Sequence, residues 1–292
     1  MDDSRRYRRR GTPDLPMAVY LVCKKQGSAA DPVAEYHPET ELRQVVSGSV
    51  KVQIDNVIHT YYTGDIFTIP ANMLHRNREF SADTRLRTLV FSADSLGLQA
   101  GHFFAEEFAK PLAQGQLQLP RLIQPGHPAH EALCRQLEQL DQCGMYEPDY
   151  KLRRFSVLMN VCMLLLPYCQ LSEASTTSDP TNDAVKKCMR YIHNNHTAKL
   201  TLADIAQVCH LHPNYLCAVF KEYTGLTVFE YLTHYRVETA AALLKKENLS
   251  VSKVAELVGF HSESLFFQKF KAIMGMTPGA YSRLSHSNMD EP

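Results

Sequence analysis

The chain has 292 residues, 45% of them hydrophobic and 21% charged, and its 31 Lys and Arg residues balance 31 Asp and Glu residues. This length predicts two domains, each large enough to bury its own core. No apolar stretch reaches the length of a membrane span, and Gly11 to Ala18 contains two prolines where a secretory signal needs an apolar segment. We therefore expect a cytoplasmic protein with no membrane partner.

The balanced net charge conceals an uneven distribution. Residues 182–292 carry 12 Lys and Arg against 10 Asp and Glu, whereas residues 1–181 carry 19 against 21. Five of those 19 are arginines between positions 5 and 10, so the rest of the N-terminal half is acidic. The C-terminal half is thus the expected partner of a polyanion. We interpret the arginine-rich tail, residues 1–14, as a disordered leader or as an arm that contacts phosphates.

The eight cysteines form no C-x-x-C pair and lie at positions 23, 134, 143, 162, 169, 188, 209 and 217. Most fall where helix or core is expected, so we interpret them as reduced, unreactive thiols of a cytosolic protein. A redox sensor that uses Cys209 and Cys217 is an alternative hypothesis.

Between Ala18 and Phe91 the pattern predicts short strands at residues 19–23, 43–46, 49–54, 65–69 and 85–91. Gly48, Asp55-Asn56 and Gly64-Asp65 supply turn residues between them. Short strands at this close spacing favour a sandwich or a barrel.

Three helices are predicted next. The first covers residues 102–109 and ends at Pro111, and the second runs from Pro128 to Cys143 and stops at Gly144. The third, from Asp149 to about Leu166, carries an apolar stripe of Leu152, Phe155, Leu158, Met159, Cys162, Met163 and Leu166. Such a stripe suits a core and also a dimer interface, and we expect a homodimer held by this helical hairpin.

The only long run of small polar residues, 171–183, predicts a linker between two domains. The expected organisation is α+β: a barrel at 15–110, the hairpin at 111–170, an all-α domain at 184–284 and a tail at 285–292.

Within residues 184–284, a short helix, a turn and a second helix occur twice, about fifty residues apart. After a leading helix from Asp183 to about Asn195, Thr201 caps the first short helix, with Asp204 placed for a capping box. The second helix of each pair begins at Pro213 or Ser262 and ends at a glycine, Gly225 or Gly275. The repeat predicts two helix-turn-helix units, whose second helices enter the DNA major groove.

The spacing of apolar residues predicts which face of each second helix is buried. Leu216, Val219, Phe220 and Tyr223 in the first, and Phe266, Phe270 and Ile273 in the second, recur with helical periodicity and should face the core. The remaining positions should contact double-stranded DNA: Asn214, Cys217, Ala218, Lys221, Ser262, Ser264, Phe267, Gln268 and Lys271. A connecting helix from Thr227 to about Glu247, roughly 30 Å long, would hold the units one DNA turn apart.

The motif residues of this region resemble the AraC/XylS family of bacterial transcription regulators. They are Ala206, Tyr215-Leu216, Phe220-Lys221, Thr224-Gly225, Tyr231-Leu232, Arg236, Ala240, Leu243-Leu244, Ala255, Val258-Gly259-Phe260, Phe266, Phe270-Lys271, Gly275, Thr277-Pro278 and Tyr281. The resemblance covers about 100 residues without a gap. It implies a monomer with two helix-turn-helix units, usually an activator that contacts RNA polymerase beside the promoter.

This chain departs from the family pattern at two positions. Family members commonly carry Arg where Ala218 and Gln268 stand. Arginine offers a bidentate contact to guanine, whereas alanine can only touch a thymine methyl group and glutamine prefers adenine. We expect less guanine readout here, with close packing of Cys217 and Ala218 against the DNA backbone as an equal alternative. Lys221 and Lys271 are interpreted as phosphate contacts.

Two motifs of the N-terminal half resemble those of the cupin barrel: Glu35-x-His37-x3-Glu41-x6-Gly48 and Gly64-x5-Pro70-x4-His75. Metal-binding cupins use two His, a Glu and a later His, and here Glu35 replaces the first His. Sensor barrels of the regulator family usually hold no metal. We therefore expect no metal or other cofactor and no enzymatic activity. The expected site is a small-molecule effector pocket lined by Glu35, His37, Glu41, His75, Tyr20 and Tyr36.

Two alternatives remain for this cluster. Imidazole and carboxylate ligands suit Fe, Mn, Ni or Zn, so the barrel could bind a metal or act as an enzyme. The histidines could also be ordinary hydrogen-bonded residues at strand ends.

Overall fold

The computed structural model describes residues 15–24, 33–99, 101–142, 148–172, 179–246 and 249–287. The described residues divide into two compact units, one within residues 15–172 and the other within residues 179–287. The whole of the predicted N-terminal tail (1–14), Cys143, Gly144 and the end of the C-terminal tail lie outside the described residues. Within the described part, no helix is both long enough and apolar enough to cross a membrane.

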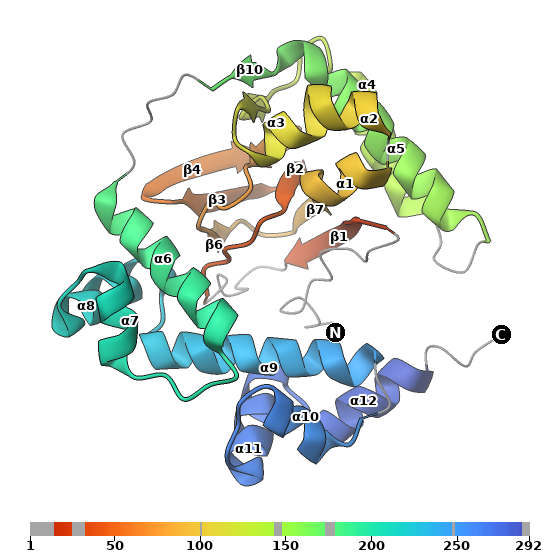
Figure 1. The fold of residues 1–292 in the computed structure, drawn as a ribbon. Helices are drawn as coiled ribbons and strands as arrows, with labels where there is room; N and C mark the ends of the chain where they lie inside the picture. The colour runs from red at the N-terminus through yellow and green to blue at the C-terminus, as the bar shows by residue number, and fades with distance from the viewer. Residues whose placement is uncertain are drawn as a thin grey trace. The chain divides into compact units, whose positions relative to one another are not determined.

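The N-terminal unit begins with two antiparallel sheets (Figure 1). Their main strands are β1 (Met17–Lys24), β2 (Thr40–Ser47), β3 (Ser49–Ile54), β4 (Val57–Tyr62), β5 (Ile66–Ile69), β6 (His75–Phe80) and β7 (Thr84–Phe91). One sheet has the order β1-β7-β2-β5-β9, in which β9 is Leu122–Ile123, and the other has the order β4-β3-β6. A small pair joins β8 (Leu117–Gln118) to β10 (Gln170–Leu171).

Helices follow the strands in this unit. They are α1 (Ala93–Gln99), α2 (His102–Phe104), a π-helical segment (Ala105–Ala109), α3 (Lys110–Ala113), α4 (His130–Gln142), α5 (Tyr150–Leu165) and a 3-10 turn (Leu166–Tyr168). The prediction that Pro111 ends the first helix is wrong, because the helix continues to Ala113. In the π-helical segment, the amide of Lys110 bonds to the carbonyl of Ala105. Pro111, which has no amide hydrogen, therefore falls where the hydrogen-bond register changes.

In the five-stranded sheet, β2, β5 and β7 are buried at nearly every position, so both of their faces are covered. Leu42, Leu89 and Phe91 belong to one core that includes Leu133 and Leu137 of α4 and Val161 of α5. Residues of the opposite face, such as Val45 and Leu86, pack with Val50 and Val52 of β3. Along β2, the side chains thus alternate between the helices and the barrel interior.

The described residues of the C-terminal unit form helices joined by loops, with no strand among them (Figure 1). Its helices are α6 (Pro180–Asn195), α7 (Leu202–Cys209), α8 (Pro213–Thr224), α9 (Val228–Lys246), α10 (Val251–Leu257), α11 (Glu263–Met274) and α12 (Pro278–Ser287). α6 begins inside the segment predicted as a linker, because the carboxylate of Asp179 caps it by accepting from the amide of Thr181 at 2.9 Å. α12 likewise extends three residues beyond the predicted domain end at 284.

Candidate functional sites

The two helix-turn-helix units, α7–α8 and α10–α11, are built alike. Thr201 and Asp204 form the expected capping box at the start of α7, and Ser250 caps α10. α8 begins at Pro213 and α11 begins after the Ser262 cap. Both helices end at a left-handed glycine, with φ of 84° at Gly225 and 76° at Gly275. The second helices of the two units therefore end in the same way.

The turns between the helices also match. The amide of Leu211 donates to the carbonyl of Ala206 at 3.0 Å, and the amide of Phe260 donates to the carbonyl of Ala255 at 2.9 Å. The residue before each of these amides has a left-handed conformation, with φ of 55° at His210 and 88° at Gly259.

The burial of α8 and α11 matches the predicted faces. Leu216, Val219, Phe220 and Tyr223 are buried in α8, and Phe266 and Phe270 are fully buried in α11, with Ile273 half-buried against the same core. All nine residues predicted to contact DNA are exposed: Asn214, Cys217, Ala218, Lys221, Ser262, Ser264, Phe267, Gln268 and Lys271. The connecting helix α9 is continuous over 19 residues.

The barrel brings together the four polar residues of the cupin-like motifs. Glu35, His37, Glu41 and His75 each offer an oxygen or nitrogen atom, and these atoms all lie within 4.8 Å of one another. Two backbone hydrogen bonds hold the segments of Glu35 and His75 together. The amide of Glu35 donates to the carbonyl of His75 at 2.7 Å, and the amide of His75 donates to the carbonyl of Glu35 at 2.9 Å. His37, Glu41 and His75 are buried, and Glu35 is partly exposed.

Each histidine of the cluster directs Nε2 toward Glu41. Oε1 of Glu41 lies 3.3 Å from Nε2 of His37 and 3.8 Å from Nε2 of His75. On the opposite side of its ring, Nδ1 of His75 donates to the carbonyl of Met73 at 2.9 Å. Because a carbonyl only accepts, that bond places the proton on Nδ1 and leaves Nε2 with its lone pair. Oε1 of Glu41 and Nε2 of His75 are buried and have no hydrogen-bond partner.

The other oxygen of Glu41 is held by arginine. Nε of Arg43 donates to Oε2 of Glu41 at 2.5 Å, and Nη1 of Arg43 donates to Oδ1 of Asn77 at 2.9 Å. Burial disfavours the charged form of Glu41, but the Arg43 guanidinium outweighs this effect and holds the pKa of Glu41 well below its usual range. Burial lowers the pKa of His75, which keeps its imidazole neutral.

Comparison with known protein families finds a helix-turn-helix domain at residues 205–284 and a cupin domain at residues 21–91. The chain is 26% identical to the uncharacterized HTH-type transcriptional regulator YdeC of Bacillus subtilis, over 94% of each chain. It is 30% identical over 127 residues to a putative AraC-like transcription regulator of Streptomyces lividans, covering 44% of this chain and 42% of that one. The chain is an AraC-type DNA-binding transcription regulator with an N-terminal cupin domain.

Among solved structures, ToxT from Vibrio cholerae aligns with a TM-score of 0.45 and 14% identity, covering 91% of the regulator and 98% of ToxT.

Sequence reasoning missed two exposed apolar residues on the reading helices of the regulator. Tyr215 in α8 is 51% exposed and Leu265 in α11 is 45% exposed. Each stands directly before a buried core residue, Leu216 or Phe266, at the same place in the repeat. Neither residue was assigned to a face from sequence, and their equivalent positions in the repeat were the signal that could have placed both on the exposed side.

The two tyrosines predicted in the effector pocket stay predictions. Tyr20 is half-buried on β1, and Tyr36 is buried between Glu35 and His37 in the sequence.

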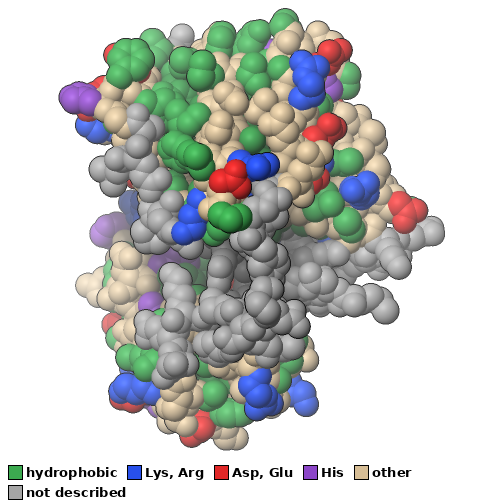
Figure 2. Space-filling view, turned by 90° about the vertical axis from the view of Figure 1, so that its right-hand side faces the viewer, with side chains coloured by type: hydrophobic (Ala, Val, Ile, Leu, Met, Phe, Trp, Pro, Cys, Tyr) green, Lys and Arg blue, Asp and Glu red, His purple; other side chains and the backbone are tan. Residues whose placement is uncertain are grey.

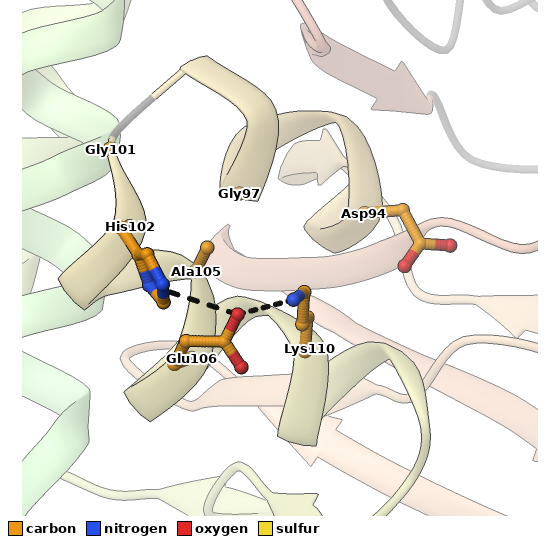
Figure 3. Close-up of a pocket in the computed structure, with 7 residues that line it drawn as sticks. All are labelled: Asp94, Gly97, Gly101, His102, Ala105, Glu106 and Lys110. Carbon is orange, nitrogen blue, oxygen red and sulfur yellow. Dashed lines mark hydrogen bonds and ion pairs between the residues drawn. The ribbon is translucent and has the colours of Figure 1, made fainter.

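A different pocket, of about 560 Å³, lies beside α1 and the π-helical segment (Figure 3). Its lining residues are Asp94, Gly97, Gly101, His102, Ala105, Glu106 and Lys110. Within it, the carboxylate of Glu106 accepts a hydrogen bond from Lys110 and lies 3.8 Å from Nδ1 of His102 (Figure 3). Two of its charged groups, Glu106 and Lys110, thus pair with each other. No motif in the sequence indicated this pocket.

The cysteines of the redox hypothesis differ in their surroundings. Cys209 is buried at the end of α7, and a hydrogen bond with the thiol of Cys188 in α6 lowers the pKa of Cys209. Cys217 is exposed on α8. The hypothesis stays untested, and the structure adds Cys188 as the hydrogen-bonded neighbour of Cys209.

Proposed function

We propose that the regulator binds one DNA duplex with α8 and α11 in successive major grooves and that a signal received by the barrel controls this binding. The observation that carries the proposal is the exposure of both predicted reading faces on helices joined by an unbroken α9. Nineteen residues at about 1.5 Å each give α9 a length of roughly 28 Å. This is close to the roughly 34 Å between successive major grooves on one side of the duplex.

Base readout is proposed to be concentrated in the second unit. Phe267 and Gln268 present an apolar ring and an amide, which suit a thymine methyl group and the edge of adenine. The equivalent positions of α8 are Cys217 and Ala218, whose short side chains allow close packing against the sugar-phosphate backbone. Lys221 and Lys271 occupy equivalent positions of the two helices and are proposed phosphate contacts.

The first test is selection of bound duplexes from a random-sequence pool by the full-length protein. We expect enrichment of two conserved segments about one helical turn apart, with A·T pairs under α11. Enrichment of a single segment, or of no sequence at all, would contradict the proposal.

The sensor part of the proposal follows the family. A small molecule bound near Glu35, His37, Glu41 and His75 shifts the population of states in which the DNA-binding domain is free to engage DNA. Activation by contact with RNA polymerase beside the promoter, and action in the cytoplasm, are proposed on the same ground. The named relatives are transcriptional regulators, which favours a role without catalysis.

A homodimer is proposed to form through α5. Hydrophobic side chains gather on one face of the N-terminal unit (Figure 2). On α5, Leu152 is 71% exposed and Met163 is 66% exposed. Leu166, the residue directly after the helix, is 46% exposed. Met159, half-buried, lies between the first two on the same side of the helix. A partner copy would cover this stripe.

Met163→Glu should weaken the dimer at least about tenfold, because it places a charge in an apolar contact. Sedimentation velocity over a concentration series measures the dissociation constant. Gln142→Glu, which adds the same charge at an exposed position of α4, should leave it unchanged. Equal dimerisation of Met163→Glu and wild-type protein would exclude this face.

A second candidate function for the barrel is metal binding. It is favoured by the two buried atoms without hydrogen-bond partners, Oε1 of Glu41 and Nε2 of His75, which face the same point as His37. Two imidazoles and two carboxylates fit a divalent transition metal, and the Nδ1 bond of His75 supports that orientation of its ring. Glu35, His37, Glu41 and His75 would hold the ion, which would supply a positive charge that an anionic effector can bind.

If the metal is present, protein purified without chelator should contain about one equivalent of Fe, Mn, Ni or Zn by mass spectrometry. His75→Ala should remove it, whereas His59→Ala, at an exposed histidine of β4, should not. Metal-free wild-type protein whose melting temperature rises with a small organic acid would instead support the effector pocket.

A further inference from the structure

Arg236, in the middle of α9, connects parts of the C-terminal unit that are distant in sequence. Its Nε donates to the carbonyl of His196 at 2.7 Å, and its Nη2 donates to the carbonyl of Ala198 at 2.8 Å. Both carbonyls lie in the loop between α6 and α7, which leads into the first helix-turn-helix unit. His196 ends α6, so the guanidinium also meets the negative end of that helix dipole.

The turn of the second helix-turn-helix unit reaches the same loop. A Cβ atom placed on Gly259 would lie 2.7 Å from the carbonyl oxygen of His196 and 2.8 Å from that of Thr197. It would also lie 3.0 Å from Nη2 of Arg236. The Arg236 guanidinium lies 5.9 Å from the ring centre of Phe260, the next residue of the turn. The backbones of the two units therefore approach each other beside Arg236.

The turn itself does not require glycine at this position. The equivalent residue of the first unit is His210, which adopts a left-handed φ of 55° and accommodates the same turn hydrogen bond. Glycine at 259 is required by the approach of the loop, because any side chain would meet backbone oxygens that cannot move independently.

We propose that Arg236 is a positioning residue that, with Gly259, holds the two helix-turn-helix units at one relative orientation and so determines the half-site spacing that the regulator accepts. α9 alone is a single helix against which each unit packs separately. The loop at 196–198, bound to α9 by Arg236 and touching the turn at Gly259, adds the direct connection that prevents rotation of one unit about α9. The inference rests on the proposed function, in which both reading helices contact one duplex.

The consequence for DNA recognition is geometric. Each base pair inserted between two half-sites moves one half-site by about 3.4 Å and rotates it by roughly 35° about the duplex axis. Reading helices held at one orientation cannot follow that displacement without bending the DNA or losing contacts. Reading helices that swivel can follow it in part.

The test uses Arg236→Met in the full-length protein, with a duplex selected from a random pool by the wild-type protein. Dissociation constants are measured by gel shift on this duplex and on versions with one base pair inserted or deleted between the two enriched segments. We expect wild-type binding to weaken about tenfold for each such change. Arg236→Met should bind the parent duplex about tenfold more weakly than wild-type protein does. Its spacing penalty, the further loss of affinity when one base pair is inserted or deleted, should be less than about threefold.

Three further variants separate orientation from charge and folding. Arg190→Met removes the same charge from an exposed position of α6, and it should keep the wild-type spacing penalty. Arg236→Lys keeps the charge but loses the two-pronged donor geometry, so it should resemble Arg236→Met. Gly259→Ala should also lower the spacing penalty, because the added methyl group separates the loop at 196–198 from the turn. Far-UV circular dichroism and melting temperature show whether each variant is folded.

Two results would overturn the inference, and they differ. If folded Arg236→Met weakens binding equally on every spacing, Arg236 has only a structural or charge role while the proposed function stands. If wild-type protein itself is indifferent to spacing, the two helices do not read one duplex, and the proposed function fails together with the inference.

Discussion

Glu41→Gln should lower the free energy of unfolding of the N-terminal unit by about 3 kcal/mol, because it breaks a buried ion pair and leaves a buried charge. Arg43 and Glu41 have side chains that are each 1% exposed. Two nitrogens of the guanidinium, Nε and Nη2, lie 2.5 Å from the same carboxylate oxygen. The amide of glutamine preserves the shape but not the charge, and Asn77 alone cannot compensate the guanidinium.

Urea unfolding of the full-length protein, followed by circular dichroism with EDTA present, measures this loss without a contribution from metal. Glu79→Gln is the matched control, since Glu79 pairs with Lys51 at 2.7 Å but both side chains are largely exposed. Such surface pairs contribute under about 1 kcal/mol. Equal stabilities of the two variants would mean that the barrel does not depend on the Glu41–Arg43 pair.

Gln268→Ala should reduce discrimination at one base step of the selected duplex by about 1–3 kcal/mol, because it removes the amide that we propose reads the base edge. Gln268 is exposed on α11, one residue after Phe267 and two before the buried Phe270. The parent sequence should lose affinity, whereas a duplex substituted at that step should bind the variant and the wild-type protein equally.

Lys271→Ala supplies the contrast on the same helix. If Lys271 contacts phosphate, its loss weakens binding by a similar factor on every duplex. The slope of log affinity against log salt concentration should also become shallower by about one. A uniform loss for Gln268→Ala as well would assign Gln268 to the backbone, and base readout would then have to come from Ser264 or Phe267.

The DNA-binding domain could be predicted from sequence because its signals are local. Caps at Thr201 and Ser262, glycines at 225 and 275, and apolar residues at helical spacing each specify a helix end or face without knowledge of the rest of the fold. The exposed positions of α8 and α11 follow from the same periodicity.

The barrel was harder to predict because its strands are defined by their partners. β4 contains the β-branched residues Val57, Ile58 and Thr60 but was not predicted as a strand. It is exposed at five of its six positions and lies at the edge of the three-stranded sheet, so it shows no alternation of apolar and polar residues. β6 contains His75, Arg76, Asn77, Arg78 and Glu79, a polar run that becomes a strand only by pairing with β3. The helix through Pro111 likewise depends on a π-helical register that no sequence pattern indicates.

The polar cluster of the barrel was predicted in part. Motif spacing identified Glu35, His37, Glu41 and His75, and the structure brings all four together. The spacing did not reveal Arg43, which follows Glu41 by two residues and therefore lies on the same, inward face of β2. Arginine is rarely buried without a partner, so its position could not be read from composition or hydropathy.

In the proposed function, one regulator chain places α8 and α11 in successive major grooves of one duplex. Hydroxyl-radical footprinting of the selected duplex with wild-type protein, Lys221→Glu and Lys271→Glu locates each helix on the DNA separately. We predict two protected segments about 10 base pairs apart on one face of the DNA for the wild-type protein, with each variant losing a different segment. A single protected segment, or loss of the same segment in both variants, would contradict the claim.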